Sequence, residues 1–236
     1  MIYQNLSEFI KTPTTALLYC SPGVGKSTAI GLIAEKSKGK TLVLDVDRTI
    51  VNTLKKGDVV KDTSRVVIRQ VDNIHTWEDW VKCLDELKTL KETGKLDFEN
   101  ICVDNISELE RCILSDLGSQ GKNKGVPAQA DYQYMQFKLV NSLRFLKSLG
   151  TNVYLTAWED IRQIVYPDGT TYSQFVPKVS LKIVDNICGL CDVVGKILAK
   201  ADGTRGIILE ATQSTYAKNQ KDTRKGCLVE EFIKGE

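Results

Sequence analysis

The residues best suited to chemistry in this chain form the run CSPGVGKST at residues 20–28. Its spacing is that of a phosphate-binding loop, with Gly23, Gly25, Lys26 and Ser27 at the diagnostic positions. The glycines permit backbone conformations that a side chain would obstruct, so successive N–H groups can surround an anion. The lysine supplies a charge for the β- and γ-phosphates, and the serine hydroxyl is a ligand for Mg²⁺. The pattern predicts a site for a nucleoside triphosphate.

We expect the nucleotide to contact every loop position after the first: Ser21, Pro22, Gly23, Val24, Gly25, Lys26, Ser27 and Thr28. Thr28 is expected near the α-phosphate. Cys20 departs from the pattern, which has glycine there, and the sequence leaves open whether it alters the entry turn. The flanks fit the motif, because residues 15–19 are apolar as in a buried strand and residues 27–38 suit a helix.

Acidic residues end two later apolar runs. Asp104 closes the run at residues 100–104, and we expect it to hold Mg²⁺ through water. Asp45 and Asp47 close the preceding run, where a carboxylate either orients the attacking water or caps the strand. In an open parallel sheet, ligands bind at the carboxyl ends of the strands, so these side chains are expected to converge on the loop.

Further polar residues follow the run at residues 152–156. Thr156 and Glu159 are candidates for sensing the γ-phosphate or polarising water. Glu108 lies one helical turn after Asp104, and the spacing leaves open whether it belongs to the site or to a solvated helix face.

The order of elements predicts an α/β fold with a mostly parallel twisted sheet, helices on both faces and antiparallel edge strands. The expected strands are residues 15–19, 41–45, 65–69, 100–104 and 152–156, with hairpins at 161–166/171–176 and 193–199/206–211. The expected helices are residues 27–38, 76–90, 107–117, 131–149 and 180–191, the last capped by Ser180, with a loop at 118–130. We expect one domain over residues 1–236, with a basic C-terminal tail from about residue 213.

The amino-acid composition limits the classes of function that this chain can have. With 32 Lys and Arg against 30 Asp and Glu, the formal charge of +2 by itself demands neither nucleic acid nor an acidic membrane. The absence of a long apolar segment predicts a cytoplasmic protein without a membrane partner. The seven cysteines are expected to be reduced, with Cys188 and Cys191 as buried structural thiols. A single histidine, His75, excludes a multi-histidine metal site.

Several motifs follow one another over most of residues 13–220: YCSPGVGKST, LVLDVDRT, ICVDNISEL, DYQYMQFKLVNSLRFLKSLGTNVYLTAWED, DVVGKI and TYAKNQ. Together they resemble the phage-encoded P-loop nucleotide-binding proteins of the RecA-like ATPase superfamily, some of which are single-strand annealing proteins in phage recombination. The resemblance implies a RecA-like core that binds ATP and Mg²⁺, a homo-oligomer, and a bacterial host cytoplasm. It also implies single-stranded DNA as a partner, and a phage recombination or single-strand-binding protein as another.

By this resemblance, Lys26, Ser27 and Asp104 match the nucleotide and Mg²⁺ positions. Asp47 matches the place of a catalytic glutamate. Lys218, in AKNQ, matches a basic position presented to a phosphate across a subunit interface, and Gln220 stands where an arginine is often found.

Two segments are candidate contacts for single-stranded DNA. The first is the loop at residues 118–130, with Lys122 and Lys124; the second is the hairpin at residues 162–178, with Tyr166, Tyr172 and Phe175. Basic residues near aromatics suit backbone attraction and base stacking. The aromatics could equally pack on their own sheet, and the basic run Lys218, Lys221, Arg224 and Lys225 could equally be a solvated surface.

Two functional hypotheses follow. In the first, an ATPase acts on single-stranded DNA in recombination or annealing, with Lys26 stabilising charge and Asp47 or Glu159 aligning water. In the second, a non-hydrolysing module uses ATP to order residues 118–130 and 160–178 for a protein partner. A small-molecule kinase would need an arginine-rich lid, and the sequence has no such cluster.

Overall fold

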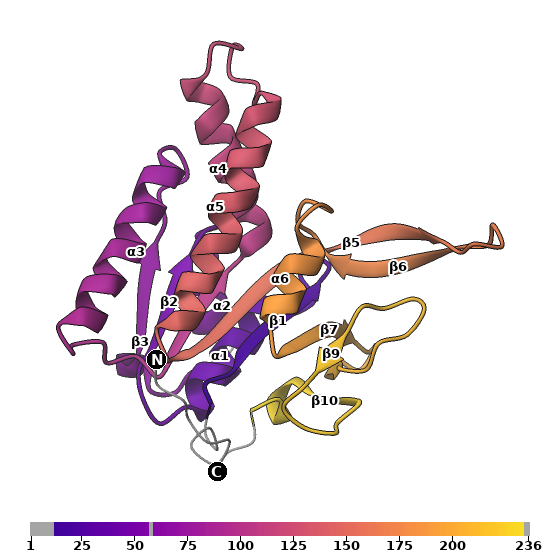
Figure 1. Cartoon of the computed structure of the whole chain (residues 1–236). Coiled ribbons are helices and arrows are strands. Elements are labelled where there is room, and N and C mark those ends of the chain that lie inside the picture. The colour runs from indigo at the N-terminus through magenta and orange to yellow at the C-terminus, as the bar shows by residue number, and fades with distance from the viewer. Residues whose placement is uncertain (1–11, 57–58, 234–236) are drawn as a thin grey trace, which may run out of the picture.

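The fold is built on one central sheet flanked by helices on both faces (Figure 1). The computed structural model describes residues 12–56 and 59–233, so the ends of the predicted 1–236 domain lie outside the described residues. Within this part of the chain the sheet has ten strands, in the order β10-β8-β7-β1-β5-β4-β2-β3, with β6 paired to β5 and β9 paired to β7. This mixed α/β architecture confirms the predicted fold class.

Most elements fall where the apolar runs predict them. The strands are β1 (Thr15–Cys20), β2 (Thr41–Asp45), β3 (Val66–Gln70), β4 (Asn100–Asp104), β5 (Asn152–Val165), β6 (Thr171–Pro177), β7 (Val193–Ala199), β8 (Arg205–Ile208), β9 (Lys218–Asn219) and β10 (Gly226–Leu228). The helices are α1 (Lys26–Lys36), α2 (Ile50–Lys56), α3 (Thr76–Glu92), α4 (Ile106–Gln120), α5 (Gln129–Ser148) and α6 (Val184–Leu190).

The middle of the sheet is parallel and buried. β1 pairs with β5 on one side and with β7 on the other, and β4 lies between β5 and β2, all in parallel register. Every residue of β1, β2 and β4 is buried, as expected for strands covered on both faces. In this register Asp45 pairs with Asp104, so the two strands end at the same level.

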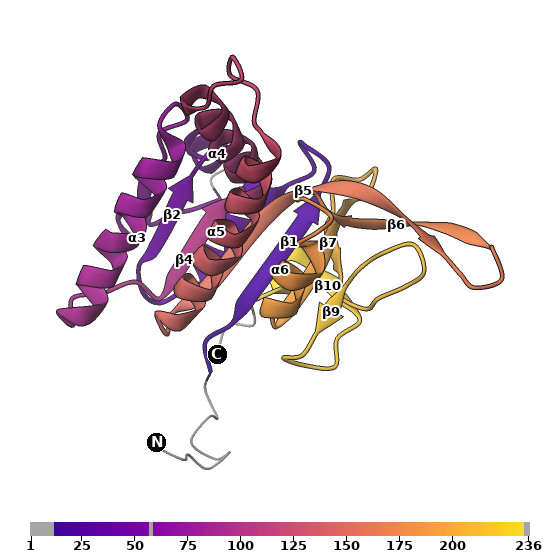
Figure 2. The ribbon, with the colours of Figure 1, turned by 45° about the horizontal axis from the view of Figure 1, so that its top comes forward.

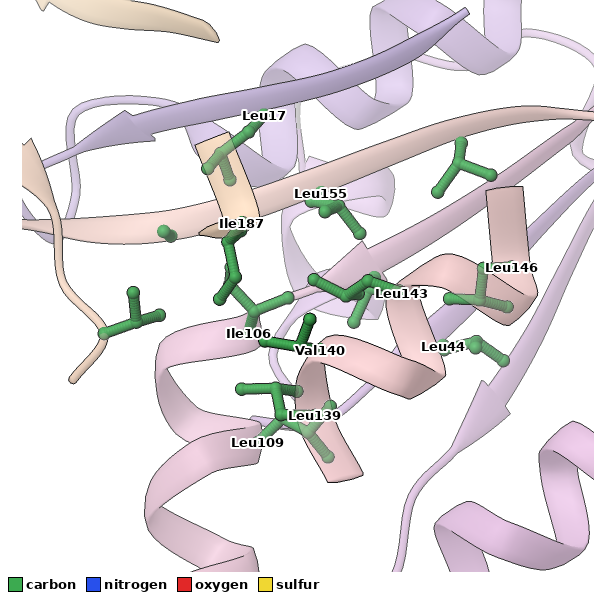
Figure 3. Packing of buried hydrophobic residues seen from close by; sticks show 14 of the residues in the cluster. Leu17, Leu44, Ile106, Leu109, Leu139, Val140, Leu143, Leu146, Leu155 and Ile187 are labelled. Atoms are coloured by element: carbon green, nitrogen blue, oxygen red, sulfur yellow. The ribbon is translucent and has the colours of Figure 1, made fainter. Parts of the chain in front are cut away.

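Each face of the sheet carries its own apolar core. Helices α3–α6 cover one face, where Leu17 and Leu155 of the sheet meet Ile106, Leu139 and Leu143 of the helices (Figure 3). On the opposite face, α1 and α2 pack with the short C-terminal 3-10 turn at Val229–Glu231. The two cores hold the carboxyl ends of the parallel strands in fixed positions.

The structure corrects three sequence predictions. Residues 152–165 form one continuous strand, so the predicted strand and the first hairpin arm are both β5, and β6 pairs with its outer half. Helix α6 begins at Val184 with Ile183 as its N-cap, and Ser180 does not cap it, because the Ser180 hydroxyl oxygen accepts a hydrogen bond from Gln136 Nε2 at 2.9 Å. The loop between α4 and α5 is shorter than predicted, at residues 121–128.

The β5–β6 hairpin projects from the body of the molecule, and the α4–α5 pair extends beyond the sheet in another direction (Figures 1 and 2). Across residues 12–56 and 59–233, no helix has the length and apolar character needed to cross a bilayer.

Candidate nucleotide-binding site

The loop between β1 and α1 has the backbone that its glycines predict. Gly23 and Gly25 have φ values of 81° and 133°, which residues with a side chain rarely adopt. Gly25 is the N-cap of α1, and no side chain caps the first turn. The amides at the positive end of α1 are therefore available to an anion.

Cys20, the departure from the motif, leaves the loop unobstructed. It is the last residue of β1, and its side chain is buried in the core beneath α1. Burial raises the pKa of its thiol to about 11. The residue therefore acts as a small apolar side chain.

Lys26 folds back over the loop. Its side chain is buried, and Nζ lies 3.4 Å from the backbone carbonyls of both Cys20 and Ser21. These are long, weak hydrogen bonds, so redirecting the ammonium to a phosphate costs little.

The Ser27 hydroxyl reaches the acidic strand end. Its Oγ donates to Asp104 Oδ2 at 2.7 Å, and Thr156 Oγ1 donates to Asp104 Oδ1 at 2.5 Å. Burial raises the pKa of Asp104, while the two hydroxyl hydrogen bonds lower it. The structure thus brings together three residues that are far apart in the sequence.

Asp47 is held beside this group. Asn105 Nδ2 donates to its Oδ2 at 2.9 Å, and Thr49 Oγ1 donates to its Oδ1 at 3.0 Å. Asp45 is fully buried, and burial raises its pKa to about 6, with the charges of Asp47 and Asp104 adding to the effect. Three carboxylates therefore lie near one edge of the sheet, where their charges repel one another.

Glu159 lies on the other side of the loop. Its Oε1 accepts a hydrogen bond from Ser21 Oγ, and its Oε2 lies 3.2 Å from Lys196 Nζ. Lys196 is buried on β7, with its ammonium 3.0 Å from the centroid of the Phe175 ring on β6. The loop is therefore joined through Glu159 to the base of the projecting hairpin.

Comparison with known protein families decides what kind of domain this is. A family model described as an AAA domain matches residues 12–220. The chain belongs to the AAA domain family. No curated protein matches the chain. The matched range contains the loop, the acidic strand ends and Glu159, so these residues belong to an AAA domain of the P-loop NTPase type.

The residues present in this AAA domain fit a magnesium ion. Ser27 and Asp104 offer a hydroxyl and a carboxylate, which are the hard oxygen ligands that Mg²⁺ prefers. The raised pKa values of Asp45 and Asp104 are those of carboxylates gathered in a buried place without enough positive charge.

Other predicted residues lie elsewhere in the AAA domain. Lys218 is on β9, where its Nζ donates to the Cys191 carbonyl at 2.7 Å and lies near the last turn of α6. The structure does not bring it to the loop of its own chain, and its predicted phosphate contact across a subunit interface stays a prediction. Glu108 is in the first turn of α4, where its amide donates to Asn105 Oδ1.

The candidate DNA contacts are divided between two projections. Tyr166 and Tyr172 pair with each other on the β5–β6 hairpin, with ring centroids 5.1 Å apart. Arg162 is bound within the body, to Asp185 at 2.9 Å. Lys122 and Lys124 are exposed beyond the end of α4.

The structure adds three residues that the sequence analysis missed: Asn105, Lys196 and Arg205, whose Nε donates to the Val24 carbonyl of the loop. A lysine inside the apolar run VVGKILA was the available signal for Lys196. Arg205 gave no local signal, because only the pairing of β8 with β7 brings it near the loop.

Proposed function

We propose that this AAA domain binds ATP with Mg²⁺ and hydrolyses it. One observation carries the proposal: Ser27 of the phosphate-binding loop donates to Asp104, which accepts a second hydroxyl from Thr156. A loop lysine, a loop hydroxyl and a buried strand-end carboxylate within one small volume form a site for a metal-bound triphosphate.

Each group of side chains has its own role in this proposal. The loop amides and Lys26 stabilise charge on the β- and γ-phosphates. Ser27, and Asp104 through water, would hold a magnesium ion, which would supply positive charge to the phosphates. Asp47 or Glu159 aligns the attacking water, and Thr156 holds Asp104 in position.

A Lys26→Ala variant tests the nucleotide site. We expect Mg²⁺–ATP affinity, measured by titration calorimetry, and ATP turnover both to fall at least tenfold, because a charged group that contacts phosphate is lost. Lys36→Ala, at the far end of α1, is the matched control and should bind as the parent does. If Lys26→Ala matches the parent in both affinity and turnover, the site is wrong.

We further propose that the domain is a single unit over residues 1–236 of a phage or prophage RecA-like protein, cytoplasmic in the bacterial host. In this proposal it forms a homo-oligomer and acts on single-stranded DNA in recombination or strand annealing, with a phage recombination or single-strand-binding protein as a partner. The resemblance of its motifs supports this assignment. Two features add support: Glu159 joins the loop to a projecting hairpin, and the exposed end of that hairpin carries the Tyr166–Tyr172 pair.

ATPase rates titrated with single-stranded and duplex DNA at two salt concentrations test the DNA proposal. We expect single-stranded DNA to raise turnover more than duplex does, and higher salt to weaken the response, because phosphate contacts release counterions. An ATPase rate that is indifferent to DNA at low salt would contradict the proposal.

One observation favours the non-hydrolysing switch as a second candidate. Both candidates for aligning water are already engaged, Asp47 by Asn105 and Glu159 by Ser21 and Lys196. Single-turnover measurements separate the two functions, since a switch binds ATP and leaves it intact with or without DNA.

A further inference from the structure

Arg205 lies against the phosphate-binding loop. It is the first residue of β8, and its Nε donates to the Val24 carbonyl at 2.8 Å. A Cβ at Gly25 would lie 2.6 Å from both Cδ and Nε of Arg205. The arginine stem therefore crosses the N-cap of α1 in space that a glycine alone leaves open.

The guanidinium has hydrogen-bonding capacity left over. Only its Nε has a hydrogen bond among the described residues, and Arg205 forms no ion pair with them. The side chain is partly exposed, and arginine stays charged at all ordinary pH values. Its terminal nitrogens form a rigid fork that suits phosphate oxygens.

The positive charge around Arg205 favours the binding of an anion. Arg205 adjoins Gly25, the residue before Lys26, at the positive end of α1. Lys26 lies close enough to Asp104 to lower the pKa of that carboxyl, whereas Arg205 has no acidic partner among the described residues. The same loop is the proposed site of the nucleotide phosphates, so a phosphate oxygen would give the guanidinium its partner.

The order of strands in the sheet indicates which phosphates of the nucleotide lie nearest to Arg205. β7 lies on one flank of β1, and β5 and β4 lie on the other (Figure 2). β8 pairs with the outer side of β7. Asp104 ends β4 on the second flank, so Arg205 approaches the loop from the side opposite to this magnesium ligand. We propose that Arg205 binds the α- or β-phosphate of the bound nucleotide. This inference rests on the proposed ATP site.

A contact with the α- or β-phosphate serves ATP and ADP alike. Arg205→Met keeps the stem that packs over Gly25 and removes the charge, so it should weaken Mg²⁺–ATP and Mg²⁺–ADP by the same factor of about tenfold to a hundredfold. Turnover at saturating ATP should fall by a smaller factor than the affinity does, because the contact is made in the ground state as well as in the transition state. The nucleotide affinity of Arg205→Lys should lie between that of the parent and that of Arg205→Met, since an ammonium keeps the charge but lacks the planar fork.

The experiment measures both affinities by calorimetry at low and high salt, with turnover beside them. Lys200→Met, on an exposed position of the same β7–β8 hairpin, removes the same charge and should bind as the parent does. The loss in Arg205→Met should shrink at high salt, because salt screens a part-exposed contact. A loss that is the same at both salt concentrations would show that Arg205 only braces the loop, and would overturn the proposal.

Two other results would also overturn it: ADP affinity within twofold of the parent, or a fall in turnover without a change in ADP affinity, which would place the arginine on the γ-phosphate. The Lys26→Ala variant keeps the two proposals apart. If it lowers nucleotide affinity and Arg205→Met does not, the ATP site stands and the role of Arg205 is wrong. If the parent binds no nucleotide, the ATP site itself is wrong.

Discussion

Glu110 gives the sharpest prediction about the stability of this fold. It lies on α4 with 7% of its surface exposed, and both carboxylate oxygens accept from the Ser180 amide, at 3.0 and 2.9 Å. Burial raises its pKa from the usual 4.5 to about 7, although the Ser180 amide lowers it. The contact joins α4 to the segment that follows the β5–β6 hairpin.

The raised pKa of Glu110 determines in which direction the stability of the fold changes with pH. Between pH 4.5 and 7 the folded chain keeps a proton on Glu110 that the unfolded chain releases. The stabilisation is therefore fully present below pH 4.5 and is lost as the pH rises through 7. The full shift corresponds to an upper limit of about 3 kcal/mol, and we expect about 1.5–3 kcal/mol because buried sites relax around a charge.

Glu110→Gln removes this titration and keeps an oxygen for the Ser180 amide. Its free energy of unfolding relative to the parent should rise by about 1.5–2.5 kcal/mol from pH 5 to pH 8. Urea unfolding at pH 5, 6, 7 and 8 measures the difference, and melting temperatures should show it as a shift of several degrees. Glu92→Gln, on the exposed side of α3, is the control and should give a flat difference. A difference for Glu110→Gln that varies by less than about 0.5 kcal/mol over this range would refute the reasoning, since it would imply equal proton binding in both states.

Three further outcomes are expected. Gly195→Ala should lower the free energy of unfolding by about 1–3 kcal/mol, because its Cβ would lie 2.5 Å from Ile207 Cγ2; Ile207→Ala in the same chain should recover part of this in urea unfolding. Thr156→Val takes a hydroxyl from buried Asp104 and should cost about 1–3 kcal/mol in thermal unfolding, whereas Thr156→Ser should cost less. Lys218→Met removes a cation from the end of α6 and should cost about 0.3–1 kcal/mol. If ATP turnover in Lys218→Met falls tenfold with so small a loss of stability, the predicted phosphate role gains support; unchanged turnover would argue against it.

Much of the fold was predictable because the central strands are buried on both faces. Runs such as residues 41–45 and 100–104 are short, apolar and closed by an acid, and such runs mark parallel strands without any tertiary information. β9 was not predictable, because it is a two-residue strand defined by pairing with Val193 and Val194 far away in the chain. The start of α6 was mispredicted for a related reason: the Ser180 hydroxyl oxygen, which would cap a helix, accepts from Gln136, a partner 44 residues away.

The site residues also differ in whether a local sequence pattern predicts them. Lys26 and Ser27 belong to a local motif, and Asp104 follows from the strand that it ends, so all three could be named from the sequence. Arg205 and Lys196 reach the loop only through the pairing of β7 with β1 and with β8, which no local pattern encodes. A lysine within a buried strand is nevertheless a signal, because burying a charge is costly without a partner, and Glu159 is that partner.

The contacts of Glu159 constrain how hydrolysis and the hairpin relate. One carboxylate oxygen accepts from Ser21 and the other faces Lys196, so both oxygens of Glu159 already have a partner, and a water molecule aligned by Glu159 would compete with these two partners for position. Releasing Lys196 would leave a buried ammonium over the Phe175 ring, and an uncompensated buried charge is strongly destabilising. Releasing Ser21 costs less, because that hydroxyl belongs to the loop and can turn to a bound phosphate. Of the two partners, Ser21 is therefore the one that Glu159 gives up more easily to a water molecule, while Lys196 and the base of the hairpin stay in place.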